Sequence, residues 1–165
     1  MFYIFLTDSL SIGCGQMVKG KRILLIDDDE NITETLVLAL EAEGFIVDFA
    51  KTGKEAISKS HENFYNLAVV DWRLPDIDGT KLLGELKQTT PKMPKIMLTG
   101  FPSMDNAIDA VNNRADAFLV KPVLFEKLLE TINDLLDQQE NDTTYNEEKM
   151  TDFIETRVKM LTRKD

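Results

Sequence analysis

Leu67-Ala68-Val69-Val70-Asp71 is an apolar run that ends abruptly at an acid, and the turn-rich sequence Trp72-Arg73-Leu74-Pro75-Asp76-Ile77-Asp78-Gly79 follows it. The run lacks an alternating pattern, which favours a central parallel strand covered by helices on both faces. Ligands of open α/β sheets bind outside the carboxyl ends of the strands, so Asp71 is a functional candidate by position. Taken alone, this acid fits a cap on the following turn equally well.

The composition indicates one ordinary domain with a modest appendage. The 165 residues are 43% hydrophobic and 29% charged, and the formal net charge is −10. This charge argues against direct nucleic-acid binding, because Lys and Arg hold phosphate backbones. The only cysteine, Cys14, forms no internal disulfide, so a reducing, cytoplasmic compartment is expected. A histidine metal site needs more than the lone His61, which fits a solvated helix end.

Residues 1–20 differ from the rest of the chain. The apolar run Met1-Phe2-Tyr3-Ile4-Phe5-Leu6 has no basic region before it and is far too short to span a membrane. We therefore expect no membrane segment here. The stretch is predicted to be a disordered leader, or to lie upstream of a natural start at Met17.

Strand and helix patterns alternate from residue 21 onward. Besides 67–71, short apolar runs predict strands at 22–26, 45–50, 95–100 and 117–120. Apolar residues at helical spacing predict helices near 32–43, 52–60, 79–86, 102–111 and 125–136. Such alternation implies a doubly wound α/β domain with a five-stranded parallel sheet.

Polar residues follow four of these strands. Asp27 and Asp28 follow the first, Asp71 the third, Thr99 the fourth and Lys121 the fifth. In a parallel sheet these positions share one edge, where three carboxylates repel one another unless a cation neutralises them. Mg²⁺ suits them because it binds carboxylates, waters and phosphate oxygens. The set is therefore suited to phosphoryl transfer onto an aspartate.

In its motifs the sequence resembles a response-regulator receiver domain of two-component signal transduction, like the chemotaxis regulators. Four motifs carry the resemblance in order: Ile26-Asp27-Asp28-Asp29, Val70-Asp71 with Leu74-Pro75-Asp76-Ile77-Asp78-Gly79, Leu98-Thr99-Gly100, and Phe118-Leu119-Val120-Lys121-Pro122. The resemblance covers residues 21–139 as the receiver domain. It implies the flavodoxin-like strand order 2-1-3-4-5 and a phosphoacceptor rather than an enzyme.

The resemblance also implies a metal and a phosphoryl donor. Asp71 would be the phosphoacceptor, taking the phosphoryl group from a sensor histidine kinase or a phosphotransfer protein. Asp28 and Asp71 would bind Mg²⁺ directly together with the backbone carbonyl of Arg73. Asp27 would hold a metal-bound water.

A switch is the third implication of the resemblance. Lys121 would pair with the phosphoryl oxygens, and Lys121-Pro122 matches a position where the family has a cis peptide. Thr99 would donate to a phosphoryl oxygen and move inward, and Phe118 would fill the space released. Phe118 fits a plain core role as well. A separate hypothesis is that bulky Phe101 slows loss of the phosphoryl group by limiting the access of water.

Residues 140–165 are predicted to form a linker and a C-terminal amphipathic helix. This segment is too short and not basic enough for a DNA-binding domain, so a stand-alone receiver that contacts an unidentified output protein is the first interpretation. The helix would pack back on the receiver, pair in a homodimer or dock on a partner. The alternatives are a truncated piece of a larger regulator or hybrid kinase, and a Mg²⁺-dependent phosphohydrolase. Arg73 stands where such a hydrolase usually has a second acid.

Overall fold

Strands and helices alternate along the part of the chain that the structure describes. The computed structural model describes residues 20–90, 92–100, 115–141, 151 and 154–155. Its elements are β1 (Arg22–Ile26), α1 (Glu30–Ala42), β2 (Ile46–Ala50), α2 (Gly53–Glu62), β3 (Leu67–Asp71), α3 (Gly79–Thr89), β4 (Lys95–Thr99), β5 (Ala117–Val120) and α5 (Phe125–Asn141). The leader, Phe101, the helix predicted near 102–111 and most of the predicted C-terminal helix lie outside the described residues.

The five strands form one parallel sheet in the order β2-β1-β3-β4-β5. The expected doubly wound topology and strand order are therefore confirmed. β1 and β3 lie inside the sheet, which explains why β1 after Arg22 and β3 before Asp71 are apolar. All four apolar residues of β3 are fully buried, and only Asp71 at its end is partly exposed.

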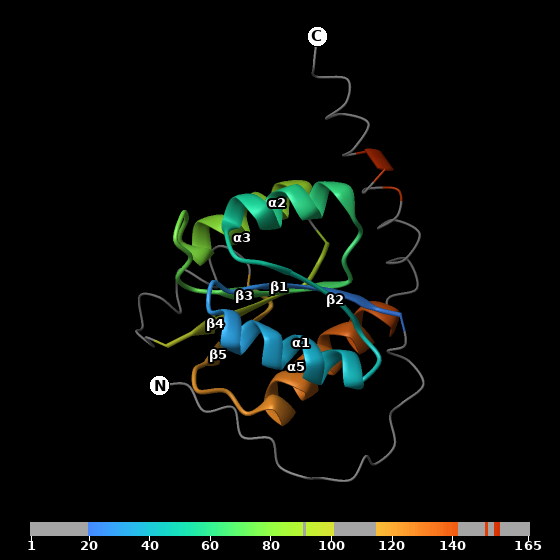
Figure 1. Cartoon of the computed structure of the whole chain (residues 1–165). Coiled ribbons are helices and arrows are strands. Elements are labelled where there is room, and N and C mark those ends of the chain that lie inside the picture. The colour runs from blue at the N-terminus through green and yellow to red at the C-terminus, as the bar shows by residue number, and fades with distance from the viewer. Residues whose placement is uncertain (1–19, 91, 101–114, 142–150, 152–153, 156–165) are drawn as a thin grey trace.

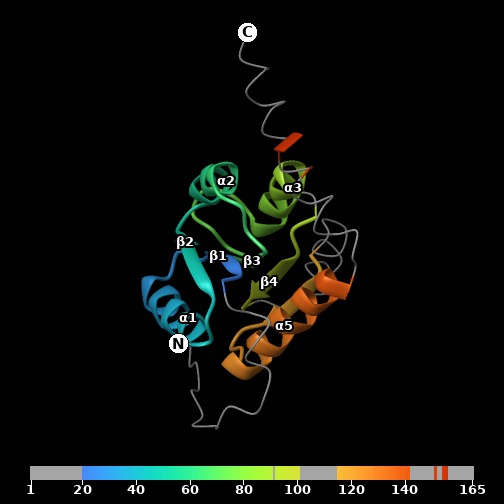
Figure 2. The same ribbon diagram turned by 90° about the vertical axis from the view of Figure 1, so that its right-hand side faces the viewer.

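Helices cover both faces of the sheet, with α1 and α5 on one face and α2 and α3 on the other (Figures 1 and 2). Alternate strand residues enter two separate cores. Ile23 and Leu25 of β1 pack in the core beneath α1 and α5, whereas Leu24 and Ile26 pack in the core beneath α2 and α3. Two-sided burial is thus the physical reason for the non-alternating strand sequences.

The helix ends follow local sequence signals. Asp29 caps α1 by accepting from the amides of Asn31 and Ile32, and Gly44 ends the turn after α1 with a φ of 96°. Thr52 caps α2 by accepting from the Glu55 amide at 3.1 Å. Thr52-Gly53-Lys54-Glu55 has the sequence form of a capping box, but Glu55 accepts from the Lys51 amide at 2.9 Å instead of the Thr52 amide.

Candidate functional site

The strand register brings the predicted site residues to one edge of the sheet. Ile26 lies beside Val70, so Asp27 and Asp71 leave neighbouring strands at the same level. Thr99 lies beside Val120, and Lys121 follows directly. Because all strands are parallel, these residues converge at their carboxyl ends.

Three of these residues form a compact group of carboxylates. Asp27, Asp28 and Asp71 each offer an oxygen within 4.8 Å of the others. Asp27 is buried, Asp71 is partly buried and Asp28 is exposed. Hard oxygen donors at this spacing fit a divalent cation such as Mg²⁺. The cluster therefore opens to solvent on the side of Asp28.

Lys121 lies between the two less exposed carboxylates. Its Nζ is 2.7 Å from Oδ2 of Asp27 and 2.9 Å from Oδ1 of Asp71. The exposed fractions of the three side chains are 6%, 2% and 12% for Lys121, Asp27 and Asp71. With Asp28, the cluster holds three carboxylates and one ammonium group, so a surplus of two negative charges remains for a cation to neutralise when all are ionised.

Burial sets the electrostatics of this group. It raises the pKa of Asp71 above the ordinary value, and the attraction of Lys121 offsets this only in part while Asp27 adds to it. Burial acts to lower the pKa of Lys121, but Asp27 and Asp71 outweigh it and raise that pKa. The lysine is therefore held charged, whereas ionised Asp71 is under-stabilised.

Several contacts fix the position of Asp27. Its amide donates to the Ala50 carbonyl at 3.1 Å, and its carbonyl accepts from the buried Thr33 hydroxyl at 3.3 Å. Its carboxylate Oδ1 accepts from the Asp29 amide at 3.0 Å, while Oδ2 contacts Lys121. Both oxygens already have protein partners, which suits contact with a cation through water.

The loop after Asp71 is tightly closed. Trp72 donates its amide to the Leu98 carbonyl at 2.8 Å, and Gly79 returns to donate to the Trp72 carbonyl at 2.8 Å. A Cβ at Gly79 would lie 2.4 Å from the Asp71 carbonyl oxygen, so only glycine fits there. Arg73, exposed and paired with Asp78 in an antiparallel bridge, lies within this closed loop.

Thr99 and Phe118 lie on the neighbouring strands β4 and β5. Thr99 is fully buried, and its carbonyl accepts from the Lys121 amide at 2.7 Å. Phe118 is partly buried and packs against the core beneath α2 and α3. The Lys121-Pro122 peptide is cis, as the resemblance implied. A backbone contact therefore links Thr99 directly to the lysine of the site.

Sequence reasoning missed the contacts of Asp76, which lies in the loop after Asp71. Its carboxylate accepts from the amides of Gly53 and Lys54 at the start of α2, at 2.8 and 3.0 Å. Asp76 is exposed, and the limited desolvation of its carboxylate acts to raise its pKa, but these amides outweigh it and lower that pKa. No spacing signal in the sequence connects a loop residue to a helix start more than twenty positions earlier.

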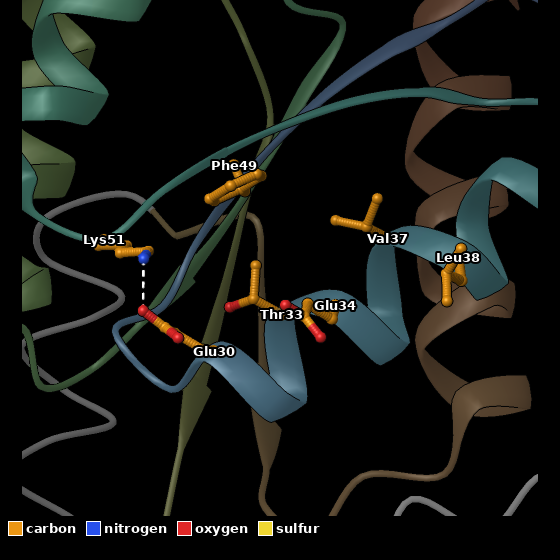
Figure 3. A pocket seen from close by; sticks show the side chains of 7 residues that line it. All are labelled: Glu30, Thr33, Glu34, Val37, Leu38, Phe49 and Lys51. Carbon is orange, nitrogen blue, oxygen red and sulfur yellow. Dashed lines mark hydrogen bonds and ion pairs between the residues drawn. The ribbon is translucent and has the colours of Figure 1, made fainter.

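A groove of about 350 Å³ lies between α1 and β2. Figure 3 shows the Glu30–Lys51 ion pair at one end and Leu38 towards the other, with Phe49 of β2 facing α1. None of the three clustered aspartates lines it.

Within the described residues, no helix is long and apolar enough to cross a membrane.

Comparison with known proteins agrees with this geometry. Residues 23–133 match the family model of the response regulator receiver domain. The transcriptional regulatory protein GlrR of Escherichia coli is 32% identical over 145 residues, which are 88% of this chain and 32% of that protein. ZraR of Salmonella typhimurium is 33% identical over 121 residues, 73% of this chain and 27% of that protein. The chain spans about a third of the length of these curated relatives.

Solved structures show the same relationship. A CheY-like receiver domain protein from Methanospirillum hungatei shares 43% identity and a TM-score of 0.73, covering 75% of this chain and 99% of that one. The beryllofluoride-activated NtrC4 receiver domain dimer shares 38% identity and a TM-score of 0.68, covering 71% and 97%.

The parallel sheet and the aspartate cluster at its carboxyl edge define a phosphoacceptor class of signalling domain. This chain belongs to the response regulator receiver domain family of two-component systems. Receivers act with histidine kinases and are phosphoacceptors rather than conventional enzymes, and an acidic triad such as this one is typical of their Mg²⁺ site.

Proposed function

We propose that Asp71 accepts a phosphoryl group from a sensor histidine kinase or phosphotransfer protein in a Mg²⁺-dependent reaction. The observation that carries this proposal is the contact of Lys121 Nζ with both Asp71 and Asp27 beside exposed Asp28. One oxygen of Asp71 forms a bond to phosphorus. The phosphorus–nitrogen bond to the kinase imidazole breaks, and its electron pair stays on the imidazole nitrogen.

The site residues would divide the work of this transfer. When bound, Mg²⁺ would neutralise charge on Asp28, Asp71 and the phosphoryl oxygens. The Arg73 carbonyl would complete its protein ligands, and Asp27 would hold a water. Lys121 would keep its contact with Asp27 while its ammonium group also pairs with a phosphoryl oxygen.

The switch would start at Thr99. The new phosphoryl oxygens attract its hydroxyl, and because Lys121 donates to the Thr99 carbonyl, both residues respond together. Phe118, on the neighbouring strand β5, would then pack into the space that Thr99 releases. The changed surface of β5 and α5 would bind the output protein in the cytoplasm, as a monomer or as a homodimer.

A second candidate output follows from the lengths of the curated relatives. GlrR and ZraR are transcriptional regulatory proteins, and the matched regions are only 32% and 27% of their lengths. This chain would then be the receiver part of a longer regulator. Immunodetection of the protein in its native cell, with its mass measured, distinguishes a chain of this size from a longer product.

The test of phosphorylation is incubation with a small acyl phosphate and Mg²⁺, followed by intact mass measurement. Wild type is expected to gain one phosphoryl group. Asp71→Asn should gain none, and a chelator should suppress the gain in wild type. An adduct that persists in Asp71→Asn would place the acceptor elsewhere, and no adduct in wild type would contradict the proposal.

A further inference from the structure

Asp76 connects the loop after the phosphoacceptor to a helix that is distant in sequence. Its Oδ1 accepts from the Gly53 amide at 2.8 Å and its Oδ2 from the Lys54 amide at 3.0 Å. These are two of the four amides that an α-helix leaves without partners at its start. Each carboxylate oxygen therefore holds one amide of α2.

The start of α2 has a cap of its own besides Asp76. Thr52 supplies that cap, because its hydroxyl accepts from the Glu55 amide and its carbonyl accepts from the Ala56 amide. The first two amides are left, and Asp76 takes both of them. The contact therefore serves to hold the loop as well as to complete the helix end.

A close packing contact supports the same connection. A Cβ at Gly53 would lie only 2.2 Å from Cγ2 of Ile77, the residue after Asp76. The loop thus lies directly against the backbone of α2. The Gly79 amide, which donates to the Trp72 carbonyl, and the Arg73–Asp78 bridge close the loop on itself directly after β3.

We propose that Asp76 is a positioning residue for the Mg²⁺ site, an inference that rests on the proposed function. By fixing the middle of the loop to α2, it sets the backbone of Arg73, whose carbonyl would be a metal ligand, relative to Asp71. Asp76 is not a ligand itself. Its two carboxylate oxygens accept from the Gly53 and Lys54 amides. Among the described residues, the acids whose oxygens lie close enough together to hold a cation are Asp27, Asp28 and Asp71.

The test is a Mg²⁺ titration of the full chain. Trp72, the only tryptophan, adjoins Asp71 and reports binding by fluorescence, and the Mg²⁺-dependent shift of the unfolding midpoint gives a second measurement. We expect Asp76→Ala to weaken Mg²⁺ binding about tenfold, as loss of an outer contact at a metal site does. The Mg²⁺ dissociation constant of Asp76→Asn should lie between those of wild type and Asp76→Ala, because its amide oxygen keeps one acceptor.

Two matched controls separate positioning from stability. Asp78→Ala removes an exposed acid from the same loop that makes no side-chain cap bond to α3. The Arg73–Asp78 bridge is a backbone contact that the variant keeps, so the Mg²⁺ dissociation constant should stay within twofold. Thr52→Ala removes the cap of α2 without touching the loop. It should lower the unfolding midpoint and also leave the dissociation constant within twofold.

The outcomes are distinguishable. Saturable binding by wild type with an unchanged constant in Asp76→Ala overturns the positioning role alone. An equal weakening in Thr52→Ala also overturns it, because general loosening of α2 would then explain the effect. Absence of any Mg²⁺ response in wild type overturns both this inference and the proposed metal site.

Discussion

Two lysines contact carboxylates at the carboxyl edge of the sheet, and their contacts differ in exposure. Lys121 contacts Asp27 and Asp71 with side chains that are 12% exposed or less. Lys51 contacts Glu30 at 2.5 Å, with exposed fractions of 47% and 66%. Both lysines contact carboxylates, but only the contacts of Lys121 are largely removed from water.

The acids respond in opposite ways to their lysines. The hydrogen bond and charge of Lys51 lower the pKa of Glu30. Burial raises the pKa of Asp71 although Lys121 is in direct contact. Burial therefore outweighs the attraction of Lys121 at Asp71, and it leaves a carboxylate whose ionised form is stabilised when a cation binds nearby. The following predictions test that difference.

The largest effect is expected for Lys121→Met, which keeps the apolar stem and removes the charge. Two little-exposed carboxylates then lack their cation, and we expect the free energy of unfolding without metal to fall by about 3 kcal/mol. Urea unfolding at neutral pH measures it. Lys51→Met is the matched control. A loss for Lys121→Met no larger than that of the control would show that burial does not matter here.

Mg²⁺ should produce the next largest effect. At a concentration 100 times its dissociation constant, a cation that binds only the folded state stabilises it by about 2.7 kcal/mol. Asp28→Asn removes a proposed direct ligand and should abolish most of this gain. Glu34→Gln, an exposed acid on α1, serves as the control. A gain of equal size in Asp28→Asn would place the cation elsewhere.

Asp71→Asn should stabilise the metal-free protein, on the order of 1 kcal/mol at neutral pH. Because the folded-state pKa of Asp71 is raised, the folded protein binds a proton more readily than the unfolded chain. Wild type therefore loses stability as the pH rises from about the ordinary value of 3.8 through the raised pKa. The asparagine variant lacks this loss.

The measurement is urea unfolding of both proteins with a chelator across that pH range. The advantage of Asp71→Asn should be smallest near pH 4 and should grow as the pH rises. An advantage that is independent of pH would mean that the substitution acts through packing instead of charge.

The sequence predicted the sheet and the residues at its edge because both depend on which stretches of the chain are buried. Apolar runs of strand length specified β1, β3 and β4, and parallel pairing then carried Asp27, Asp71 and Thr99 to the same edge. The strand register can be predicted without knowing which side chains touch. The convergence of these residues therefore follows from the parallel strand order alone.

Contacts made by side chains across loops were not predictable in this way. The sequence indicated a charge at Lys121 but not its simultaneous contact with Asp27 and Asp71. It gave no sign that Asp76 reaches the start of α2, because that contact depends on how the loop folds in space. The roles assigned to the site residues, the domain limits and the role of Phe101 stay predictions.

The smallest effect is expected for the exposed pair. Lys51→Met should change the unfolding midpoint by less than about 2 °C, because an exposed ion pair gains little over its contacts with water. Any change should shrink at 1 M salt, where screening is strong, while the effect of Lys121→Met should persist. Thermal unfolding of both variants at low and high salt makes this comparison. If salt weakened both effects equally, water would reach Lys121 as readily as Lys51, and the raised pKa of Asp71 would need a cause other than burial.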